Sequence, residues 1–331
     1  MKRISYYDNL KGILILSVIL WHTLNICASF YDFDNSIAIV LSFFMIPLFI
    51  YTTGVFARMS KKKPIQRAAK MFLLFIVSQI IVTLYFKYVL GILGSNASIF
   101  EPRYTLWYLI TCASLYLLEY LIRNKNFKKV FIITLLIGIF IGFVSFINDF
   151  MSISRTICFL PFFVLGYYSK EINFLEKIKN KSTIISFTSL IIIIFLIFNP
   201  DFFTFKDTYL KYSYFSYSTP LTCFINRILM YFIFIVFSMY ILLLIPKKKS
   251  FLCTLGKNSL VIYLSHGVIL KTVKTNELFF SSPIFGSIVL YISLVIFCLI
   301  IVYLIKKFKH NISFKGVFSK INILEKQTQK W

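Results

Sequence analysis

The strongest constraint on this chain is a series of apolar runs, each close to the length of a helix that crosses a membrane. Crossing the hydrocarbon core takes about 20 predominantly apolar residues in an α-helix. The sequence contains ten such runs, of which the sixth and the ninth are short, at residues 9–28, 36–57, 71–88, 104–122, 130–147, 156–169, 182–199, 221–245, 257–271 and 283–305. Hydrophobic residues make up 59% of the 331 positions, more than soluble domains contain. The pattern predicts an all-α, polytopic membrane protein with about ten transmembrane helices.

The basic residues predict the orientation of these helices. Of the 36 lysine and arginine residues, 28 fall on the side of the membrane that holds the N-terminus, and 8 fall on the other side. Short cytoplasmic loops are enriched in lysine and arginine, so both termini are predicted to be cytoplasmic. The net charge of +24 is then explained by topology, and no nucleic-acid partner is predicted. Residues 1–305 are expected to form one membrane domain, and residues 306–331 a basic cytoplasmic tail.

The stretch NLKGILILSVILWHT, residues 9–23, places polar residues on one face of an otherwise apolar helix. Lys11 and His22 are eleven residues apart, which on an α-helix corresponds to about three turns plus 20° and a rise of about 16 Å. Asp8 lies within about 40° of the same face. Lipid offers no hydrogen-bond partner to such a stripe. The stripe must therefore face other protein or a wet cavity, and it predicts a functional site.

Two of the three histidines lie inside predicted spans. His22 and His266 both fall in the middle or outer half of the bilayer, so that the two rings could approach each other. Histidine suits proton transfer near neutral pH because its unperturbed pKa is about 6.5. A neutral histidine that is hydrogen-bonded between helices is the alternative for both residues. His310 lies in the basic tail and is expected to be solvated.

Basic residues on the predicted cytoplasmic side indicate a site for phosphate groups. The loop RMSKKKPIQRAAK, residues 58–70, begins at Arg58 and holds six basic residues. Arg67 and Lys70 are three residues apart and share a face at the start of the third span. Arginine can hold a phosphate through two parallel hydrogen bonds. Ordinary positive-inside charge is the alternative explanation for the whole loop.

Further candidates lie on the outer side. Arg227 is about seven residues inside the eighth span, where it either snorkels outward or lines a polar cavity with Asp149 or Glu101 as its partner. Arg155 lies on the outer rim, where it either receives an acceptor or is simply solvated. The long outer loop 199–220 is rich in tyrosine, which suits either stacking on sugar rings or an interfacial aromatic belt.

The remaining polar residues of the spans predict structural roles. Glu119 and Arg123 are four residues apart and are expected to form an ion pair along their helix. The six cysteines are scattered, mostly within apolar runs, and no two of them form a close pair. Zinc sites and disulfide frameworks need closely spaced cysteines or a regular framework of them. The sequence therefore predicts neither a disulfide framework nor a metal site.

Six fragments, in their order along the chain, resemble the membrane acyltransferase-3 family, and in particular its branch of sugar O-acetyltransferases such as fucose 4-O-acetylases. The fragments are YYDNLKGILILSVILWHT (6–23), FFMIPLFIYTTGVFAR (43–58), RAAK (67–70), TLWYL (105–109), SRTICFLPFFVLGYYSKE (154–171) and SLVIYLSHGVIL (259–270). That family pairs a basic residue with a histidine eleven positions later in its first helix. Lys11 stands where arginine is common, and Lys70 stands where a second arginine is frequent.

The resemblance implies an integral membrane O-acyltransferase that moves an acyl group, usually acetyl from acetyl-CoA, to a hydroxyl of a surface glycan or its lipid-linked precursor. His22 would be the catalytic histidine and Lys11 its basic partner. The candidates for contacting coenzyme A are Arg67, Lys70 and Arg58. The candidates for binding the sugar acceptor are His266, Arg155, Arg227 and Trp107. The expected location is the bacterial cytoplasmic membrane, with the lipid bilayer and glycan-assembly proteins as partners.

Two other functions stay open at this stage. A transporter or flippase of a lipid-linked saccharide would also use basic-inside helices with intramembrane polar residues, although no pair of broken helices is evident in the sequence. A membrane sensor or scaffold without catalytic activity is the other alternative. Transfer of label from acetyl-CoA to a glycan separates the enzyme from both.

Overall fold

The computed structural model describes residues 4–31, 36–93, 100–145, 150–217, 219–275 and 283–311, and every structural statement below concerns these residues. Within them the chain forms helices and no strands. The α-helices are α1 (Ser5–Tyr31), α2 (Ser36–Met59), α3 (Pro64–Tyr88), α4 (Trp107–Ile122), α5 (Phe127–Phe140), α6 (Ile153–Tyr168), α7 (Phe174–Asn180), α8 (Ser182–Phe198), α9 (Phe205–Thr208), α10 (Pro220–Leu244), α11 (Leu252–Lys257), α12 (Ser259–Thr275) and α13 (Pro283–Asn311).

Each of the ten predicted spans overlaps one of these helices. Six of the helices, α1, α2, α3, α6, α10 and α13, are long and apolar enough to cross a membrane in the described part of the chain. The pair α7 and α8, bent by 77° at its break, is a seventh if it forms one span. The spans predicted at 104–122, 130–147 and 257–271 fall on the shorter helices α4, α5 and α12. The last predicted span runs longer than expected, because α13 continues to Asn311, into the predicted tail.

Local sequence signals explain where several helices begin. Pro64 occupies the first turn of α3, where its missing N–H costs nothing. The side chain of Gln66 accepts a hydrogen bond from the backbone of Lys63 at 3.2 Å, which closes the same turn. The side chain of Asn126 caps α5 by accepting from the backbone of Lys129. These starts are set by short-range chemistry: α3 begins at Pro64, well before the predicted residue 71, and α5 begins at Phe127, close to the predicted residue 130.

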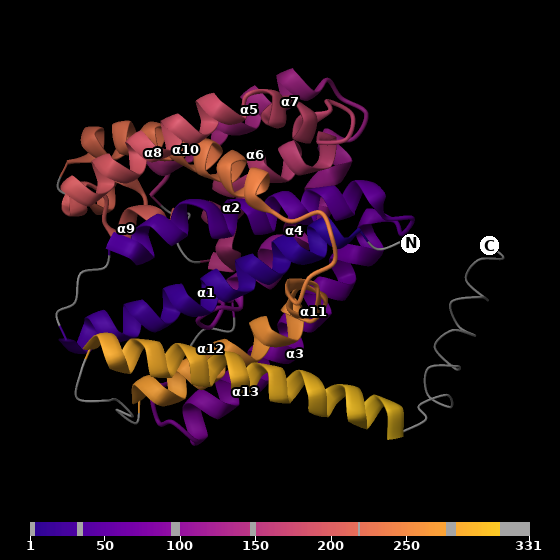
Figure 1. Ribbon diagram of the computed structural model, residues 1–331, viewed down its shortest axis with the longest axis vertical. Coiled ribbons are helices and arrows are strands. Elements are labelled where there is room, and N and C mark those ends of the chain that lie inside the picture. The colour runs from indigo at the N-terminus through magenta and orange to yellow at the C-terminus, as the bar shows by residue number, and fades with distance from the viewer. Residues whose placement is uncertain are drawn as a thin grey trace.

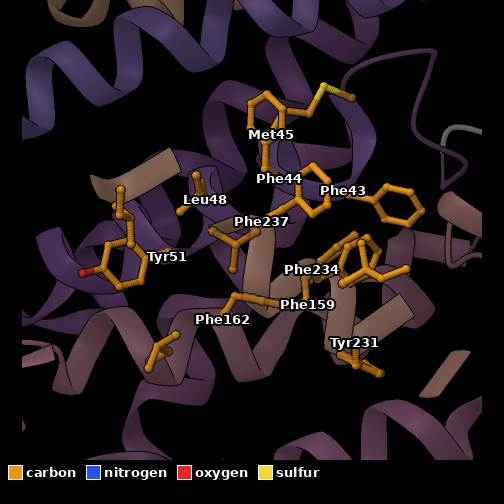
Figure 2. Close-up of a cluster of buried hydrophobic side chains, with 14 of the residues drawn as sticks. Phe43, Phe44, Met45, Leu48, Tyr51, Phe159, Phe162, Tyr231, Phe234 and Phe237 are labelled. Atoms are coloured by element: carbon orange, nitrogen blue, oxygen red, sulfur yellow. The ribbon is translucent and has the colours of Figure 1, made fainter. Parts of the chain in front are cut away.

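The main hydrophobic core lies between α2, α6 and α10. Figure 2 shows aromatic side chains of α2, including Phe43, meeting Phe159 and Phe162 of α6 and Phe234 and Phe237 of α10. Close approach of α2 and α6 depends on two glycines. A Cβ atom on Gly54 would lie 2.1 Å from the carbonyl oxygen of Phe163, and one on Gly166 would lie 2.0 Å from that of Tyr51. Neither position leaves room for a side chain.

Helix α1 crosses the middle of the molecule, with α2 on one side and the α11–α13 segment on the other (Figure 1). A second hydrophobic cluster joins α1, α12 and α13, and a third joins α3, α4 and α12. The chain near Gly256 approaches α1 so closely that a Cβ atom there would lie 1.8 Å from the carbonyl oxygen of Asp8. Helix α1 is thus enclosed by helices from both halves of the sequence.

Burial separates inner helices from outer ones. In α2 and α6, 72% of the apolar span is buried inside the bundle, whereas in α3 and α13 only 28% is. The outer helices expose large apolar side chains, such as Leu73 on α3 and Phe297 on α13. In water such surfaces would be a liability, but in a bilayer they face lipid. Because α1 is enclosed by other helices, its polar residues lie in the interior of the bundle and not against lipid.

Candidate active site

A cavity of about 570 Å³ runs alongside the polar face of α1. Its wall is built from α1, α2, α4 and α12, together with the segments around Tyr104 and Tyr209. Lys11 and His22 both line it, as their eleven-residue spacing predicts. The volume lies within the range of sites that hold small molecules or cofactors. The polar stripe therefore faces a cavity rather than lipid.

His22 is held by aromatic neighbours at this wall. The hydroxyl of Tyr104 lies 3.1 Å from its Nδ1 atom, within hydrogen-bond distance. The ring of Trp21 meets the His22 ring edge-on, with centroids 4.6 Å apart. One ring nitrogen is thus fixed by a side-chain partner while the imidazole borders the cavity. This is the arrangement of a positioned proton acceptor.

His266 lies directly behind His22. The two ring centroids are 5.3 Å apart, so the predicted approach of the two histidines is confirmed. His266 is completely buried, and its Nδ1 atom donates to the carbonyl of Ile262 at 3.1 Å. Its Nε2 atom has no hydrogen-bond partner among the described residues. With Nδ1 protonated, Nε2 carries a lone pair, and His266 is a neutral acceptor beside the cavity wall.

Tyr104 is the site residue that the sequence reasoning missed. It adopts a left-handed backbone conformation with φ of 50°, which is unusual for a residue other than glycine. Gln79 of α3 holds the preceding chain, because its side chain donates to the carbonyl of Glu101 at 2.7 Å and accepts from the backbone of Arg103 at 2.9 Å. The hydroxyl of Tyr263 donates to the carbonyl of Thr105. A buried glutamine in an apolar helix was the signal that could have indicated this support.

Lys11 lies at the opposite end of the α1 stripe. Its Nζ atom is 3.0 Å from the carboxylate of Asp8, one turn earlier in the helix. The same ammonium group lies 4.8 Å from the ring centroid of Phe56, close enough for a cation–π contact. The Lys11 side chain keeps 18% of its surface exposed, whereas that of Asp8 is almost fully buried. Lys11 is therefore a compensated cation that still reaches the cavity.

The predicted coenzyme A contacts are not brought together. Arg67 forms a buried salt bridge of 2.6 Å with Glu119 of α4 and lies over the ring of Tyr116. This corrects the predicted pairing of Glu119 within its own helix, because the neighbouring helix brings a better-placed arginine. Lys70 is exposed, so it does not share the buried environment of Arg67. Arg58 is exposed and contacts the hydroxyl of Tyr167 at 3.3 Å, away from the cavity.

Arg155 and Trp107 lie together on the cavity wall near His22. The Arg155 guanidinium lies 4.7 Å from the Trp107 ring centroid and donates to the carbonyl of Tyr209 at 3.3 Å. Burial raises the pKa of the Tyr209 phenol, while the nearby Arg155 charge opposes that rise. Tyr209 is consequently a neutral phenol at physiological pH. Two aromatic rings and one cation thus border the cavity beside the imidazole.

Arg227 lies outside this cavity. It is buried, stacks 4.8 Å from the ring centroid of Tyr214, and donates to the sulfur of Cys158 at 3.6 Å and the carbonyl of Tyr212 at 3.4 Å. These contacts tie α10 to α6 and to the loop that contains Tyr212 and Tyr214. Snorkelling to solvent is therefore not what this arginine does. Glu101, one of its predicted partners, is exposed, and the other, Asp149, lies outside the described residues.

Three further expectations concern the cysteines, a metal site and His310. All six cysteines are free, and five of them are buried. In the part of the chain that the structure describes, no group of three or more histidine, cysteine, aspartate or glutamate residues could hold a metal ion. The side chain of His310 lies outside what the structure describes.

Fold and cavity together define the class: a multi-pass membrane protein, helical in the residues that the structure describes, with a cavity that borders a candidate proton-transfer centre at His22. The chain belongs to the acyltransferase-3 family, because the family model described as an acyltransferase domain matches residues 4–307. Searches among curated proteins and among solved structures found no match. Family and apolar helices together indicate a membrane acyltransferase.

Proposed function

We propose that the protein is an O-acyltransferase of the sugar-modifying branch, moving an acetyl group from acetyl-CoA to a hydroxyl of a surface glycan or its lipid-linked precursor. The observation that carries the proposal is the position of His22, which borders the cavity while Tyr104 fixes one of its ring nitrogens. A general base needs both access to the reacting hydroxyl and a defined tautomer.

The donor enters from the end of the cavity at Lys11. The nucleotide phosphates of acetyl-CoA lie against the exposed side chains of Arg58 and Lys70, which end α2 and begin α3 at that end of the bundle. The pantetheine arm extends along the α1 stripe past Lys11 towards His22. Arg67 supports this end indirectly, since its salt bridge to Glu119 joins α3 to α4 beside Tyr116, which lines the cavity.

The chemical step joins the acceptor oxygen to the acyl carbon. His22 donates Nδ1–H to the oxygen of Tyr104, which leaves the lone pair on Nε2 to remove the proton of the acceptor hydroxyl. The oxygen forms a bond to the thioester carbonyl carbon, the carbon–sulfur bond breaks, and the proton passes from the imidazolium to the departing thiolate. Trp107 and Arg155 bind the sugar, and the neutral His266 accepts a hydrogen bond from it.

An acyl-histidine intermediate is the alternative route. In that route Nε2 of His22 attacks the thioester first, and the acceptor hydroxyl then removes the acyl group from the imidazole. Both routes place the reacting atoms at the same nitrogen. They differ in whether label from acetyl-CoA stays on the protein when no acceptor is present.

In this proposal the chain crosses the bacterial cytoplasmic membrane about ten times, with α4, α5 and α12 as short crossings and both termini in the cytoplasm. The acceptor then meets the cavity from the outer side. Separate glycan-assembly proteins would supply it.

A transporter or flippase of a lipid-linked saccharide is the second candidate, since the cavity extends along much of α1, from Lys11 past Asn25. The two functions differ in their need for a donor. An acyltransferase leaves the acceptor O-acetylated, whereas a flippase moves it across the bilayer unchanged and needs no acetyl-CoA.

The deciding experiment is chemical analysis of the surface glycan from cells with and without this protein. We expect alkali-labile acetate on the glycan only where the protein is produced, and its loss where the gene is deleted. Purified protein in liposomes with labelled acetyl-CoA should transfer label to glycan extracted from the deletion cells. Equal acetate in both cell types, or movement of the glycan without acetyl-CoA, would overturn the assignment.

A further inference from the structure

The face of α2 that borders the cavity is apolar along most of its length, with side chains such as Phe49 and Phe56. Thr52 and Thr53 interrupt this face with two adjacent hydroxyl groups, and both residues line the cavity. Both are buried, with 2% and 7% of their surface exposed. Polar groups inside a membrane protein are costly unless they have partners. The two hydroxyl groups therefore call for an explanation within the helix or within the cavity.

The hydroxyl hydrogens of both threonines are directed at their own helix. Thr52 donates to the carbonyl of Phe49 at 2.8 Å, and Thr53 donates to the same carbonyl at 3.0 Å. The hydroxyl of Tyr108, which lines the cavity from α4, lies 3.0 Å from the Thr53 oxygen and 3.4 Å from that carbonyl. A hydroxyl group has one hydrogen and two lone pairs. With their hydrogens so used, Thr52, Thr53 and Tyr108, which we call the hydroxyl cluster, offer hydrogen-bond acceptors to the cavity.

The hydroxyl cluster lies between the two ends of the polar stripe of α1. On one side, Phe56 is about one turn along α2 from the threonines, and its ring centroid is 4.8 Å from the Lys11 ammonium group. On the other side, the ring centroid of Tyr108 lies 5.5 Å from that of Tyr263, which lies 5.8 Å from that of His266. His266 in turn packs behind the proposed base. The cluster is therefore located part-way along the route proposed for the acyl donor.

An acyl-CoA that extends from Lys11 to His22 has to pass this cluster. In such a molecule two methylene groups follow the thioester sulfur, and an amide N–H comes next. With the sulfur beside His22, this N–H is the first polar hydrogen on the way back towards Lys11. A buried N–H group needs a hydrogen-bond acceptor. The hydroxyl cluster supplies acceptors on this part of the route, where the rest of the α2 face is apolar.

We propose that the hydroxyl cluster binds the amide N–H nearest the sulfur of the acyl-CoA and so sets how far the thioester reaches along α1. The proposal rests on the acyltransferase function proposed above and assigns residues inside the membrane that bind its acyl donor. The alternative is that each threonine hydroxyl serves only its own helix, as threonines in helices often do. In that case its removal changes the stability of the protein and not the choice of acyl donor.

The test compares acetyl-CoA with an analogue in which oxygen replaces the amide nitrogen nearest the sulfur. The analogue keeps the thioester, the length of the arm and the phosphates, but it lacks the N–H group. The purified full-length protein receives either compound, with a labelled acetyl group, together with glycan from cells that lack the protein. We expect kcat/KM of the wild type to be about tenfold lower for the analogue, the loss expected for one hydrogen bond. Equal values would overturn the proposal and leave the acyltransferase standing, whereas transfer from neither compound would overturn the acyltransferase itself.

Tyr108→Phe and Thr53→Val each remove one hydroxyl group of the cluster and keep the shape of the side chain. We expect kcat/KM for acetyl-CoA to fall about fivefold in each variant, while kcat/KM for the oxygen analogue stays the same. The tenfold preference for acetyl-CoA should thus shrink to about twofold, and Thr53→Ser should restore it. KM for the glycan should not change in these variants. An equal fall for both compounds would indicate a structural role only, and a change in the glycan KM alone would assign the cluster to the saccharide; either result would overturn the proposal.

The matched control is Thr134→Val on α5. Thr134 is buried and donates to the carbonyl of Phe131 at 3.0 Å within its own helix, but it does not line the cavity. The control therefore loses the same kind of hydrogen bond as Thr53→Val, and the preference for acetyl-CoA over the oxygen analogue should stay about tenfold. An equal loss of preference in Thr134→Val would show that disturbance of the fold causes it, and this would also overturn the proposal.

Discussion

The two ends of the cavity carry the same sign of charge in different settings. At the end near Lys11, the Lys11 ammonium group is paired with Asp8. The nearby Arg67 is paired with Glu119, so each of these two cations has a carboxylate within 3.0 Å. At the other end, Arg155 contacts a carbonyl and aromatic rings. A compensated cation positions helices and donates hydrogen bonds in fixed directions.

The largest effect is expected between the two ends, at His22. His22→Ala removes the proposed base, and we expect kcat for acyl transfer to fall about 10³-fold, within the range for loss of a general base. Both ends of the cavity stay intact in this variant. KM for acetyl-CoA and for the acceptor should therefore change little. Steady-state kinetics of the purified protein measure all three quantities.

The control for that variant is Ser17→Ala on the same helix. Ser17 does not line the cavity, and its hydroxyl bonds the carbonyl of Ile13 in its own helix. It should keep wild-type activity. A folded His22→Ala protein that acylates at the normal rate would contradict the catalytic role of His22. The two ends of the cavity could then no longer be described as the donor side and the acceptor side of that residue.

The next effect concerns stability at the compensated end. Glu119→Gln leaves the Arg67 guanidinium buried without its carboxylate, and we expect a loss of about 3 kcal/mol in the free energy of unfolding. Thermal unfolding in detergent measures this as a lower Tm. The pair variant Arg67→Met/Glu119→Leu removes both charges and should recover most of the loss, since apolar replacement of a buried pair is often neutral.

If Glu119→Gln melted at the wild-type temperature, the salt bridge would contribute nothing to the fold. The salt bridge would then not distinguish the Lys11 end of the cavity from the Arg155 end. Arg123→Gln is the natural comparison, because Arg123 is exposed and should have an effect near zero.

A smaller effect is expected at Lys11. Lys11→Met keeps the stem but removes the ammonium group, and we expect KM for acetyl-CoA to rise about tenfold, with the acceptor KM unchanged. Lys11→Arg keeps the charge and should stay near the wild-type value. The two KM values thus report on the two ends of the cavity separately. Loss of a charge at the Arg155 end should instead raise the acceptor KM and leave the KM for acetyl-CoA unchanged. A change in the acceptor KM alone would reverse the assignment of donor and acceptor ends.

The smallest effect is expected at Tyr104. Tyr104→Phe removes the hydroxyl that lies 3.1 Å from His22 but keeps the ring. One hydrogen bond contributes about 1 kcal/mol, so kcat should fall about fivefold while both KM values remain similar. Single-turnover rates would show the decrease directly. An unchanged rate would mean that the imidazole is held well enough by Trp21 and His266.

Much of the architecture was predictable from local patterns. Apolar runs determine helices, and the helical period determines which residues of one helix share a face, so the alignment of Lys11 with His22 follows from the sequence. The proximity of His22 and His266 was also predicted, from the depth of each residue in its span. The number of helices that cross the membrane is harder to predict, because α4, α5 and α12 are shorter than a helix that spans the hydrocarbon core.

Partnerships between helices could not be predicted in the same way. Glu119 has a basic residue four positions along its own helix, yet it pairs with Arg67, 52 residues away in sequence. Among the residues that the structure describes, Arg227 contacts no carboxylate and instead bonds a thiol and a carbonyl. Helix packing decides such pairs, because it sets which side chains come within reach of one another.

By itself, the sequence determined that the chain forms apolar helices, which face of α1 is polar, and that an imidazole and an ammonium group share that face. These features depend on distances within one helix, which backbone geometry fixes. Only the tertiary structure decided that Tyr104, 82 residues away, meets His22, and that Arg155, Lys211, Lys271 and Lys274 converge on one wall. Those residues come from separate segments, and their positions depend on how the bundle packs.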